Sequence, residues 1–215
     1  MKLPMVAERY LTTRSRTATL VYMARPREFD AGQVLDRATE LFWSKGYEET
    51  SMRDLEEGLG VGRQSLYSTF GDKRDLFLAA LDRYAAQQAE GVAPLLQPGA
   101  GLEEIRAYFN DLVKRTACAG PRRSCMMLNS VVQFGQSDPE VARRYEANQE
   151  QLAAAFRYAL SGAARKGELS ASADVAALAL FLVSQLYGLA VLSKSGASPA
   201  TLARVVDTAL AALAG

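Results

Sequence analysis

Residues 50–71, TSMRDLEEGLGVGRQSLYSTFG, form the stretch that decides how the whole chain is interpreted. Ser51, followed three residues later by Asp54, is a pairing that caps the start of a helix. Apolar residues then recur at helical spacing as far as Gly60, a residue suited to a left-handed helix end. A second amphipathic helix is predicted over residues 63–70. Two short helices joined by a glycine turn make a helix-turn-helix, whose second helix can enter a major groove.

The second predicted helix has a polar face that suits contact with DNA. Its side chains carry hydrogen-bond donors and acceptors that match base edges and phosphates: Arg63, Gln64, Ser65, Ser68 and Thr69. The first three stand in the first turn, which is the part of such a helix nearest to base edges. The same stretch also fits an ordinary corner between two helices of a bundle, because the generic pattern is loose.

The sequence around this stretch resembles the TetR family of transcriptional regulators. The resemblance runs from Asp30 to Phe77 and is carried by LFWSKGYEETS, MRDLEEGLGV and SLYSTFGDKRDLF. It implies an all-α protein, with an N-terminal three-helix, helix-turn-helix DNA-binding domain and a C-terminal helical domain for ligand binding and dimerisation. Two positions depart from the family's common pattern. Gly62 stands where a Ser or Thr usually caps the recognition helix, and Thr69 stands where an aromatic residue or His is frequent.

The resemblance and the helix positions together give a set of predicted DNA-binding residues. Arg63, Gln64 and Ser65 are expected at base edges. Tyr67 and Lys73 are expected at phosphates, by resemblance to the family. The full predicted set is Ser51, Arg53, Gly62, Arg63, Gln64, Ser65, Tyr67, Ser68 and Lys73. The expected partner is a double-stranded DNA operator with two half-sites in an inverted repeat.

Charge and composition divide the chain into three predicted parts. Although the net charge is only +1, residues 1–27 carry six basic side chains against one acidic side chain. This segment lacks the long apolar run of a signal peptide. Translation from Met23 is an alternative, because MARPREFD resembles a typical family N-terminus. The predicted parts are a flexible basic arm (1–26), the DNA-binding domain (27–87, with its motif at 50–69) and a ligand-binding and dimerisation domain (88–215).

The composition excludes several classes of site. The chain has no histidine, so a Ser-His-Asp triad, a His general base and a His metal site are impossible. Its two cysteines, Cys118 and Cys125, cannot make a four-ligand zinc site, and no cofactor is expected. So few cysteines fit a reducing cytoplasm. The alternative classes are an enzyme that uses carboxylates or lysines, and a helical protein-interaction module with no role at DNA.

Five further helices are predicted beyond a Gly- and Pro-rich loop at residues 91–101. The helix over residues 175–192 is apolar on every side, so it is buried on both sides or lies in a membrane. Ser184 and Gln185 at its middle would be costly in lipid, so no membrane span is predicted. With the last helix it is expected to form a homodimer, as the resemblance also implies, with Leu186 at the interface. The predicted ranges are 102–118, 122–135, 139–165, 175–192 and 199–214.

Aromatic and methionine side chains of the C-terminal part are candidates for an apolar ligand cavity, which the family resemblance implies. Methionine suits an adaptable cavity wall. The alternative is plain core packing, which is expected for most of these residues. The candidates are Tyr108, Phe109, Met126, Met127, Phe156, Phe181 and Tyr187.

Cys125, in the segment PRRSCMMLNS, is a candidate sensor of oxidants or electrophiles. It is expected just inside a helix start and close to Arg122 and Arg123, and both features would lower the pKa of its thiol. The segment looks similar to that of some TetR-like regulators that respond to electrophiles or oxidants. The alternative is a small buried cysteine beside two methionines, whose burial would raise the pKa and leave the thiol inert.

These features predict a ligand-responsive transcriptional regulator, a repressor that binds its operator as a dimer. A small apolar or reactive molecule in the C-terminal domain is expected to act as inducer. It would move the fourth predicted helix, which Asp72 caps and which is long enough to belong to both parts of the chain. That movement would change the distance between the two recognition helices, so both half-sites would be lost together.

Overall fold

The computed structural model describes residues 29–118 and 124–214, and the described residues form helices and loops with no strand among them. The predicted all-α fold is confirmed. The predicted basic arm lies outside the described residues. The helices are α1 (Ala31–Lys45), α2 (Met52–Leu59), α3 (Arg63–Phe70), α4 (Lys73–Val92), η1 (Ala93–Leu96), α5 (Leu102–Cys118), α6 (Met126–Phe134), η2 (Gly135–Ser137), α7 (Pro139–Arg165), α8 (Val175–Lys194) and α9 (Pro199–Ala214).

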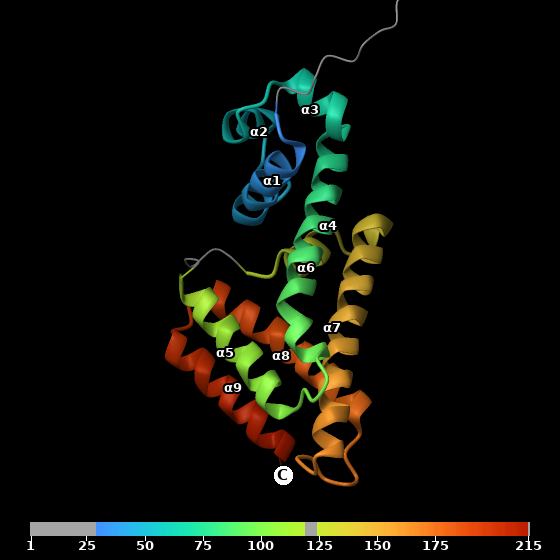
Figure 1. The fold of residues 1–215 in the computed structure, drawn as a ribbon. Helices are drawn as coiled ribbons and strands as arrows, with labels where there is room; N and C mark the ends of the chain where they lie inside the picture. The colour runs from blue at the N-terminus through green and yellow to red at the C-terminus, as the bar shows by residue number, and fades with distance from the viewer. Residues whose placement is uncertain (1–28, 119–123, 215) are drawn as a thin grey trace, which may run out of the picture.

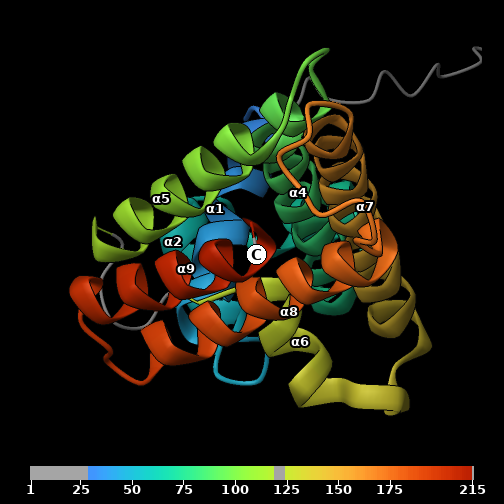
Figure 2. The same cartoon turned by 90° about the horizontal axis from the view of Figure 1, so that it is seen from below.

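Two groups of helices are arranged along the long helix α4 (Figure 1). Helices α1, α2 and α3 lie at its first half, and α5, α8 and α9 lie near its second half, while α6 and α7 pack along α4 between the two groups. Leu76 and Leu81 of α4 belong to a first apolar core, whereas Val92 belongs to a second. Seen from below, α5, α9 and α8 lie side by side, with α7 packed against α8 (Figure 2). The fourth helix is therefore shared by both groups, as the sequence predicted.

The helix boundaries of the first group follow from capping residues, among them the predicted Ser51 and Gly60. The Asp30 carboxylate accepts hydrogen bonds from two backbone N–H groups in the first turn of α1. Ser51 and Asp54 form a reciprocal capping box at the start of α2. Gly60 ends α2 with a φ of 67°, a left-handed conformation that glycine adopts without strain. Gly62 offers no side chain to cap α3, as expected.

Some boundaries differ from the predicted ones, and two of these differences bear on the candidate site. The loop expected over residues 91–101 begins later, because α4 continues to Val92, which is buried in the second core. The helix expected over residues 122–135 begins only after Cys125, which occupies the N-cap with an extended backbone. The Cys125 Sγ accepts a hydrogen bond from the Leu128 N–H at 3.5 Å. Cys125 therefore precedes α6 and does not lie inside its first turn.

The start of α6 packs into the core of the first group. Met126 and Met127 are 2% and 1% exposed, and they belong to the same apolar cluster as Phe42 of α1 and Phe77 of α4. Val141 of α7 joins this cluster as well. The predicted division of the chain near residue 87 stays a prediction, and apolar packing crosses it through α6 and α7.

Two ion pairs hold α4 against α7. Arg74 donates from Nη2 to Asp138 Oδ1 at 2.8 Å and from Nε to Asp138 Oδ2 at 3.2 Å. Arg144 of α7 donates from Nε to Asp82 Oδ1 of α4 at 2.8 Å and from Nη2 to Asp82 Oδ2 at 3.0 Å. The Arg74 guanidinium also holds the pKa of Asp138 below its usual range. Exposed pairs contribute little free energy, but a two-pronged pair restricts the orientation of the helices that it joins.

Helix α8 has one buried and one exposed face, although both are apolar. By length and composition alone it is long and apolar enough to cross a membrane. Leu182 and Val183 lie in the second core, whereas Leu180 and Val191 are 54% and 57% exposed. The expectation that Leu186 lies at a dimer interface is wrong, because its side chain is buried in the core of its own chain.

Gly162 of α7 is expected to tolerate no side chain. A Cβ atom there would lie 1.9 Å from the backbone carbonyl oxygen of Ala100, which cannot rotate away. We expect Gly162→Ala to lower the free energy of unfolding in urea by about 1–3 kcal/mol. In the control Gly58→Ala, the Cβ would lie 3.4 Å from Leu41 Cδ2, an ordinary contact, so stability should rise by up to about 1 kcal/mol. Unchanged stability of Gly162→Ala would contradict this close packing.

Candidate functional site

Helix α3 lies at the outer end of the molecule, away from α5 and α9 (Figure 1). Leu66 is buried and anchors the helix, while Arg63, Gln64 and Ser65 of its first turn are exposed. The remaining predicted DNA-binding residues are exposed as well, except for half-buried Lys73: Ser51, Arg53, Gly62, Tyr67 and Ser68. The fold thus presents the predicted residues to solvent, and their contact with DNA stays a prediction.

Some of these side chains are held by neighbouring aromatic rings. Arg63 Nη2 donates to the Tyr67 hydroxyl at 3.0 Å, and its guanidinium carbon lies 5.2 Å from the centre of the Tyr67 ring. Lys73 Nζ lies 4.1 Å from the centre of the Tyr47 ring. Such contacts are weak at exposed sites, so a phosphate can replace them at little cost. They keep both cations extended over the surface next to α3.

The Tyr47 ring connects the Lys73 ammonium to α6. Its centre lies 4.8 Å from that of Phe77 in α4 and 5.4 Å from that of Phe134 at the end of α6. Phe42 of α1 lies 5.2 Å from Phe77 and completes the cluster. Burial raises the pKa of Tyr47, so the ring stays neutral. Lys73, which is predicted to contact a phosphate, therefore rests on the Tyr47 ring, and Phe134 of α6 contacts the same ring.

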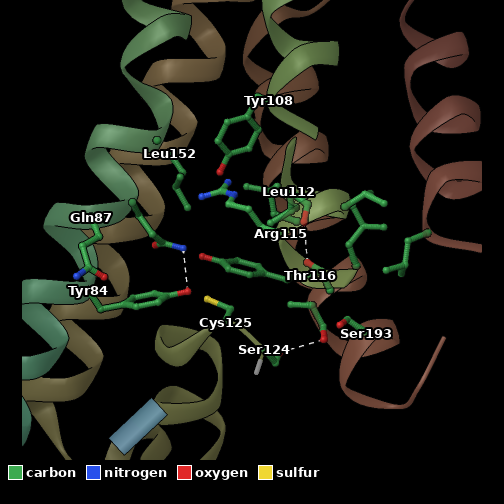
Figure 3. Close-up of a pocket in the computed structure, with 18 of the residues that line it drawn as sticks. Tyr84, Gln87, Tyr108, Leu112, Arg115, Thr116, Ser124, Cys125, Leu152 and Ser193 are labelled. Atoms are coloured by element: carbon green, nitrogen blue, oxygen red, sulfur yellow. Dashed lines mark hydrogen bonds between the residues drawn. The ribbon is translucent and has the colours of Figure 1, made fainter. Parts of the chain in front are cut away.

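A cavity of about 190 Å³ lies among α4, α5, α7, α8 and α9 and the start of α6 (Figure 3). Three predicted residues line it, namely Tyr108, Cys125 and Tyr187. Trp43 of α1 also reaches its wall, so the first group of helices borders the cavity directly. The apolar part of the wall is mostly leucine: Leu112, Leu152, Leu186, Leu189 and Leu202.

The other predicted ligand residues do not reach this cavity, which corrects the expected convergence. Phe109 and Phe156 are fully buried in the second core, with their rings stacked 5.8 Å apart. Met126 and Met127 are buried in the first core. Phe181 is on the outer face of α8 and borders a shallow hollow against α9. Periodicity placed each residue on an apolar face, but the faces of different helices turn toward different cores.

Several polar residues that the sequence did not single out complete the cavity. Tyr84, Gln88 and Gly91 follow one another at helical spacing along α4, and Arg115 comes from α5. Gln88 Nε2 donates to the Tyr84 hydroxyl at 3.3 Å. Gln88 Oε1 is buried and has no hydrogen-bond partner among the described residues. The signal that could have found these residues is a polar residue recurring at positions 84 and 88 on an inward face of the fourth helix.

The tyrosine hydroxyls of the cavity are neutral at physiological pH. Burial raises the pKa of Tyr108 to about 12, and it also raises the pKa of Tyr84 and of Tyr187. No aspartate or glutamate is among the described residues that line the cavity, and Arg115 is the one charged residue among them. The cavity therefore combines neutral hydroxyl groups, an apolar interior and a single cation.

The electrostatic environment of Cys125 is the opposite of that expected. Burial raises the pKa of its thiol, and this effect outweighs the Leu128 N–H and the Tyr84 hydroxyl, which lower it. Figure 3 shows the sulfur of Cys125 beside the hydroxyl of Tyr84, and the side chain remains partly exposed. Arg122 and Arg123, which were expected to lower the pKa, lie outside the described residues. The described environment agrees with the alternative, in which the thiol is protonated at neutral pH.

The chain matches two family models and several curated relatives. Residues 34–80 match the model described as bacterial regulatory proteins, tetR family, and residues 101–209 match the tetracyclin repressor-like C-terminal domain. The HTH-type transcriptional regulator YezE of Bacillus subtilis is 39% identical over 89% of this chain and 100% of its own length. The HTH-type transcriptional repressor ComR of Escherichia coli is 30% identical over 86% of this chain and 90% of its own length.

Solved structures show the same arrangement of helices. One is a TetR family regulator, CifR, with cysteine substitutions and in complex with 26-base-pair double-stranded operator DNA. It is 30% identical to this chain, with a TM-score of 0.77, and the match covers 87% of this chain and 99% of CifR. The reduced form of Escherichia coli NemR has a TM-score of 0.73 over 83% of this chain and 93% of NemR, and at 19% identity it shows the shared fold alone.

We expect Cys125 to be alkylated slowly at neutral pH. The thiolate is the reactive form, and burial keeps this thiol protonated, so the rate with iodoacetamide should be low at pH 7 and rise steeply above pH ~9. The variant Cys118→Ser leaves Cys125 as the single cysteine, and mass spectrometry measures the rate. The same protein unfolded in urea supplies the reference. A folded rate at pH 7 that equals or exceeds the unfolded rate would contradict the raised pKa.

Proposed function

This chain belongs to the TetR family of bacterial regulatory proteins, and we propose that it represses transcription as a homodimer that a small molecule releases from DNA. Members of the family are DNA-binding regulators, so the chain acts at DNA and not as an enzyme. The observation that carries the proposal is the exposed first turn of α3, which Leu66 holds in place. Its guanidinium, amide and hydroxyl groups, on Arg63, Gln64 and Ser65, are the kinds of group that read base edges. The proposed compartment is the cytoplasm.

The relatives support a repressor that binds double-stranded DNA. CifR, of similar fold and 30% identity, was solved with a double-stranded operator. ComR of Escherichia coli and AcnR of Corynebacterium glutamicum, 29% identical over 81% of this chain, are both named repressors. An activator, FasR of Mycolicibacterium smegmatis, matches only 34% of this chain. Similarity over most of the chain therefore favours repression.

The exposed apolar face of α8 supports a homodimer. Leu180, Phe181 and Val191 are 54%, 36% and 57% exposed, and they lie on the side of α8 that turns away from its own core. A shallow hollow beside Phe181, between α8 and α9, leaves room for side chains of a second copy. Soluble proteins rarely leave such an apolar face open, because its burial is favourable. We propose that α8 and α9 pair with their copies in a four-helix interface.

The cavity among α4, α5, α7, α8 and α9 is the proposed inducer site. Its wall includes Tyr84 and Gln88 of α4, and the same helix carries Lys73 at its other end, next to α3. A ligand that displaces the inner half of α4 therefore moves Lys73 and α3 as well. In a dimer, such a movement changes the separation of the two recognition helices. The two recognition helices must fit the two half-sites at the same time, so a shift of a few ångströms weakens binding to both half-sites.

The proposed inducer is a small molecule with an apolar body, and a reactive molecule is the second candidate. Leucines cover much of the cavity wall, which favours the apolar body. Cys125 borders the same cavity, so a reactive molecule that entered it would meet a thiol. The raised pKa of that thiol weighs against fast reaction at neutral pH.

Substitutions on α3 and α4 should separate base recognition from phosphate contact. Gln64→Ala should change which operator sequences bind best, because base edges carry the sequence information. Lys73→Ala should weaken binding to every sequence and reduce the salt slope by about one, because it removes one phosphate contact. Gel-shift titrations at several salt concentrations, on DNA from beside the protein's own gene, measure both. Failure of wild type to bind any of this DNA would contradict the proposed function. Altered preference in Lys73→Ala, with none in Gln64→Ala, would reverse the assignment.

The substitution Leu180→Arg should give a monomer that no longer binds the operator, because it places a charge in the proposed apolar interface. Leu96→Arg is the matched control, since Leu96 is 47% exposed and lies in η1, outside the proposed α8–α9 interface. Light scattering at micromolar concentration measures the mass of each protein. A stable wild-type monomer, or a Leu180→Arg protein that stays dimeric, would rule out this interface.

A further inference from the structure

We infer that the cavity selects a one-ring molecule that carries a carboxylate, with the ring against the leucines and the carboxylate at Arg115 and Tyr108. This inference rests on the proposed function, in which the cavity is the inducer site. It goes further by naming the chemical class of the ligand, and it follows from how charge and hydrogen-bond donors are distributed around the cavity.

Arg115 is placed to meet an anion at the edge of the cavity. It comes from α5, and its Nε lies 2.8 Å from Asp111 Oδ2 on the same helix. Its Nη1 extends toward α4, where it lies 3.9 Å from the position that a Cβ of Gly91 would occupy. Figure 3 shows the guanidinium and the Tyr108 hydroxyl turned toward each other at one side of the cavity. The guanidinium therefore spans the gap between two helices that form the cavity wall.

The bond to Asp111 leaves donors on Arg115 for a ligand. Asp111 takes Nε, and no other carboxylate of the described residues forms an ion pair with this guanidinium. The side chains of Arg115 and Asp111 are 55% and 62% exposed, so their pair contributes little free energy and does not neutralise the site strongly. A carboxylate that enters the cavity can accept from Nη1 and Nη2 as a planar, two-pronged partner, a geometry that only the guanidinium offers.

The other residues that line the cavity favour an anionic ligand over a cationic one. No aspartate or glutamate is among the described lining residues, so a cationic ligand would find no partner there. The Tyr108 hydroxyl is buried and stays protonated, so it can donate a second hydrogen bond to the carboxylate. Both partners on this side are thus donors. A carboxylate offers them two acceptor oxygens and a negative charge, whereas a neutral amide offers one acceptor oxygen and no charge.

The size of the cavity and its leucine lining favour a single ring. A cavity of about 150 Å³ holds benzene, and this one measures about 190 Å³, which leaves room for a ring with one or two small substituents. Leu112, Leu152 and Leu189 supply the apolar wall for the ring. Gln88 Oε1, buried and without a partner among the described residues, can accept from a hydroxyl on that ring. A hydroxylated ring acid would therefore satisfy more of the cavity than an unsubstituted one.

The test compares matched acids and amides by isothermal titration calorimetry on the full-length protein without DNA. The probes are benzoate and benzamide, phenylacetate and phenylacetamide, and 4-hydroxybenzoate and 4-hydroxybenzamide. We expect at least one acid to bind about tenfold or more tightly than its amide. Arg115→Gln should remove that preference, raising the dissociation constant of the acid by about tenfold or more, and Tyr108→Phe should raise it less.

The matched control is Arg106→Gln. Arg106 is also on α5 and also exposed, but it pairs with Asp207 of α9 and does not line the cavity, so acid binding should not change. No binding by any acid, equal binding of acids and amides, or an unchanged acid affinity in Arg115→Gln overturns the inference. Operator release is measured separately with the same probes. If the acids bind without releasing the operator, the proposed function is contradicted and the ligand class is not. If the amides, and not the acids, bind and release the operator, the ligand class is contradicted and the proposed function is not.

Discussion

The segment over residues 124–127 is the connection on which the rest of the structure depends. The Ser124 hydroxyl donates to the carbonyl oxygen of Ala190 in α8 at 2.9 Å, and the Ser124 carbonyl accepts from the Trp43 indole of α1. Cys125 borders the cavity, while Met126 and Met127 are buried in the core that holds α1 to α4. Four consecutive residues therefore connect α8, the cavity and the group of helices α1 to α4. A displacement at any one of these places strains the other two, because packed cores are nearly incompressible.

Helix α4 provides a second connection, and two ion pairs fix part of it against α7. Arg74, at the DNA-binding end of α4, and Asp82, at its middle, tie it to α7 at two points about two turns apart. The inner half, with Tyr84 and Gln88, carries instead the cavity wall. Such an arrangement holds one part of the helix against α7 while the other part lines the cavity. Under the proposed function, a ligand in the cavity would act on α3 by way of α4 without requiring the DNA-binding group to unfold.

The sequence was sufficient wherever local chemistry decides the structure. Ser51 and Gly60 set helix ends through capping and backbone preference, which depend only on near neighbours, and these predictions were confirmed. The predicted start of α6 was wrong, because Cys125 caps the helix from outside it, and cysteine is not a usual N-cap residue. Which aromatic residues line the cavity could not be predicted either. Periodicity gives the apolar face of each helix but not the neighbour that the face meets, as Phe109 in the core and Phe181 on the surface show.

The cavity is a place where the helices around it make fewer contacts with one another than they would in a fully packed core. It measures about 190 Å³ and is lined by residues of α4, α5, α7, α8 and α9. Gln88 Oε1 is buried and has no hydrogen-bond partner among the described residues, so it is an acceptor that a ligand could satisfy. In a fully packed core, a molecule bound elsewhere would not favour a new arrangement of the helices. Here the cavity is bordered by α4, which also packs in the core of the DNA-binding group. Under the proposed function, an arrangement of α4 that closes on a ligand gains contacts with it. The difference in ligand contacts between the two arrangements of α4 then sets the upper limit of the free energy that would move α3 away from DNA.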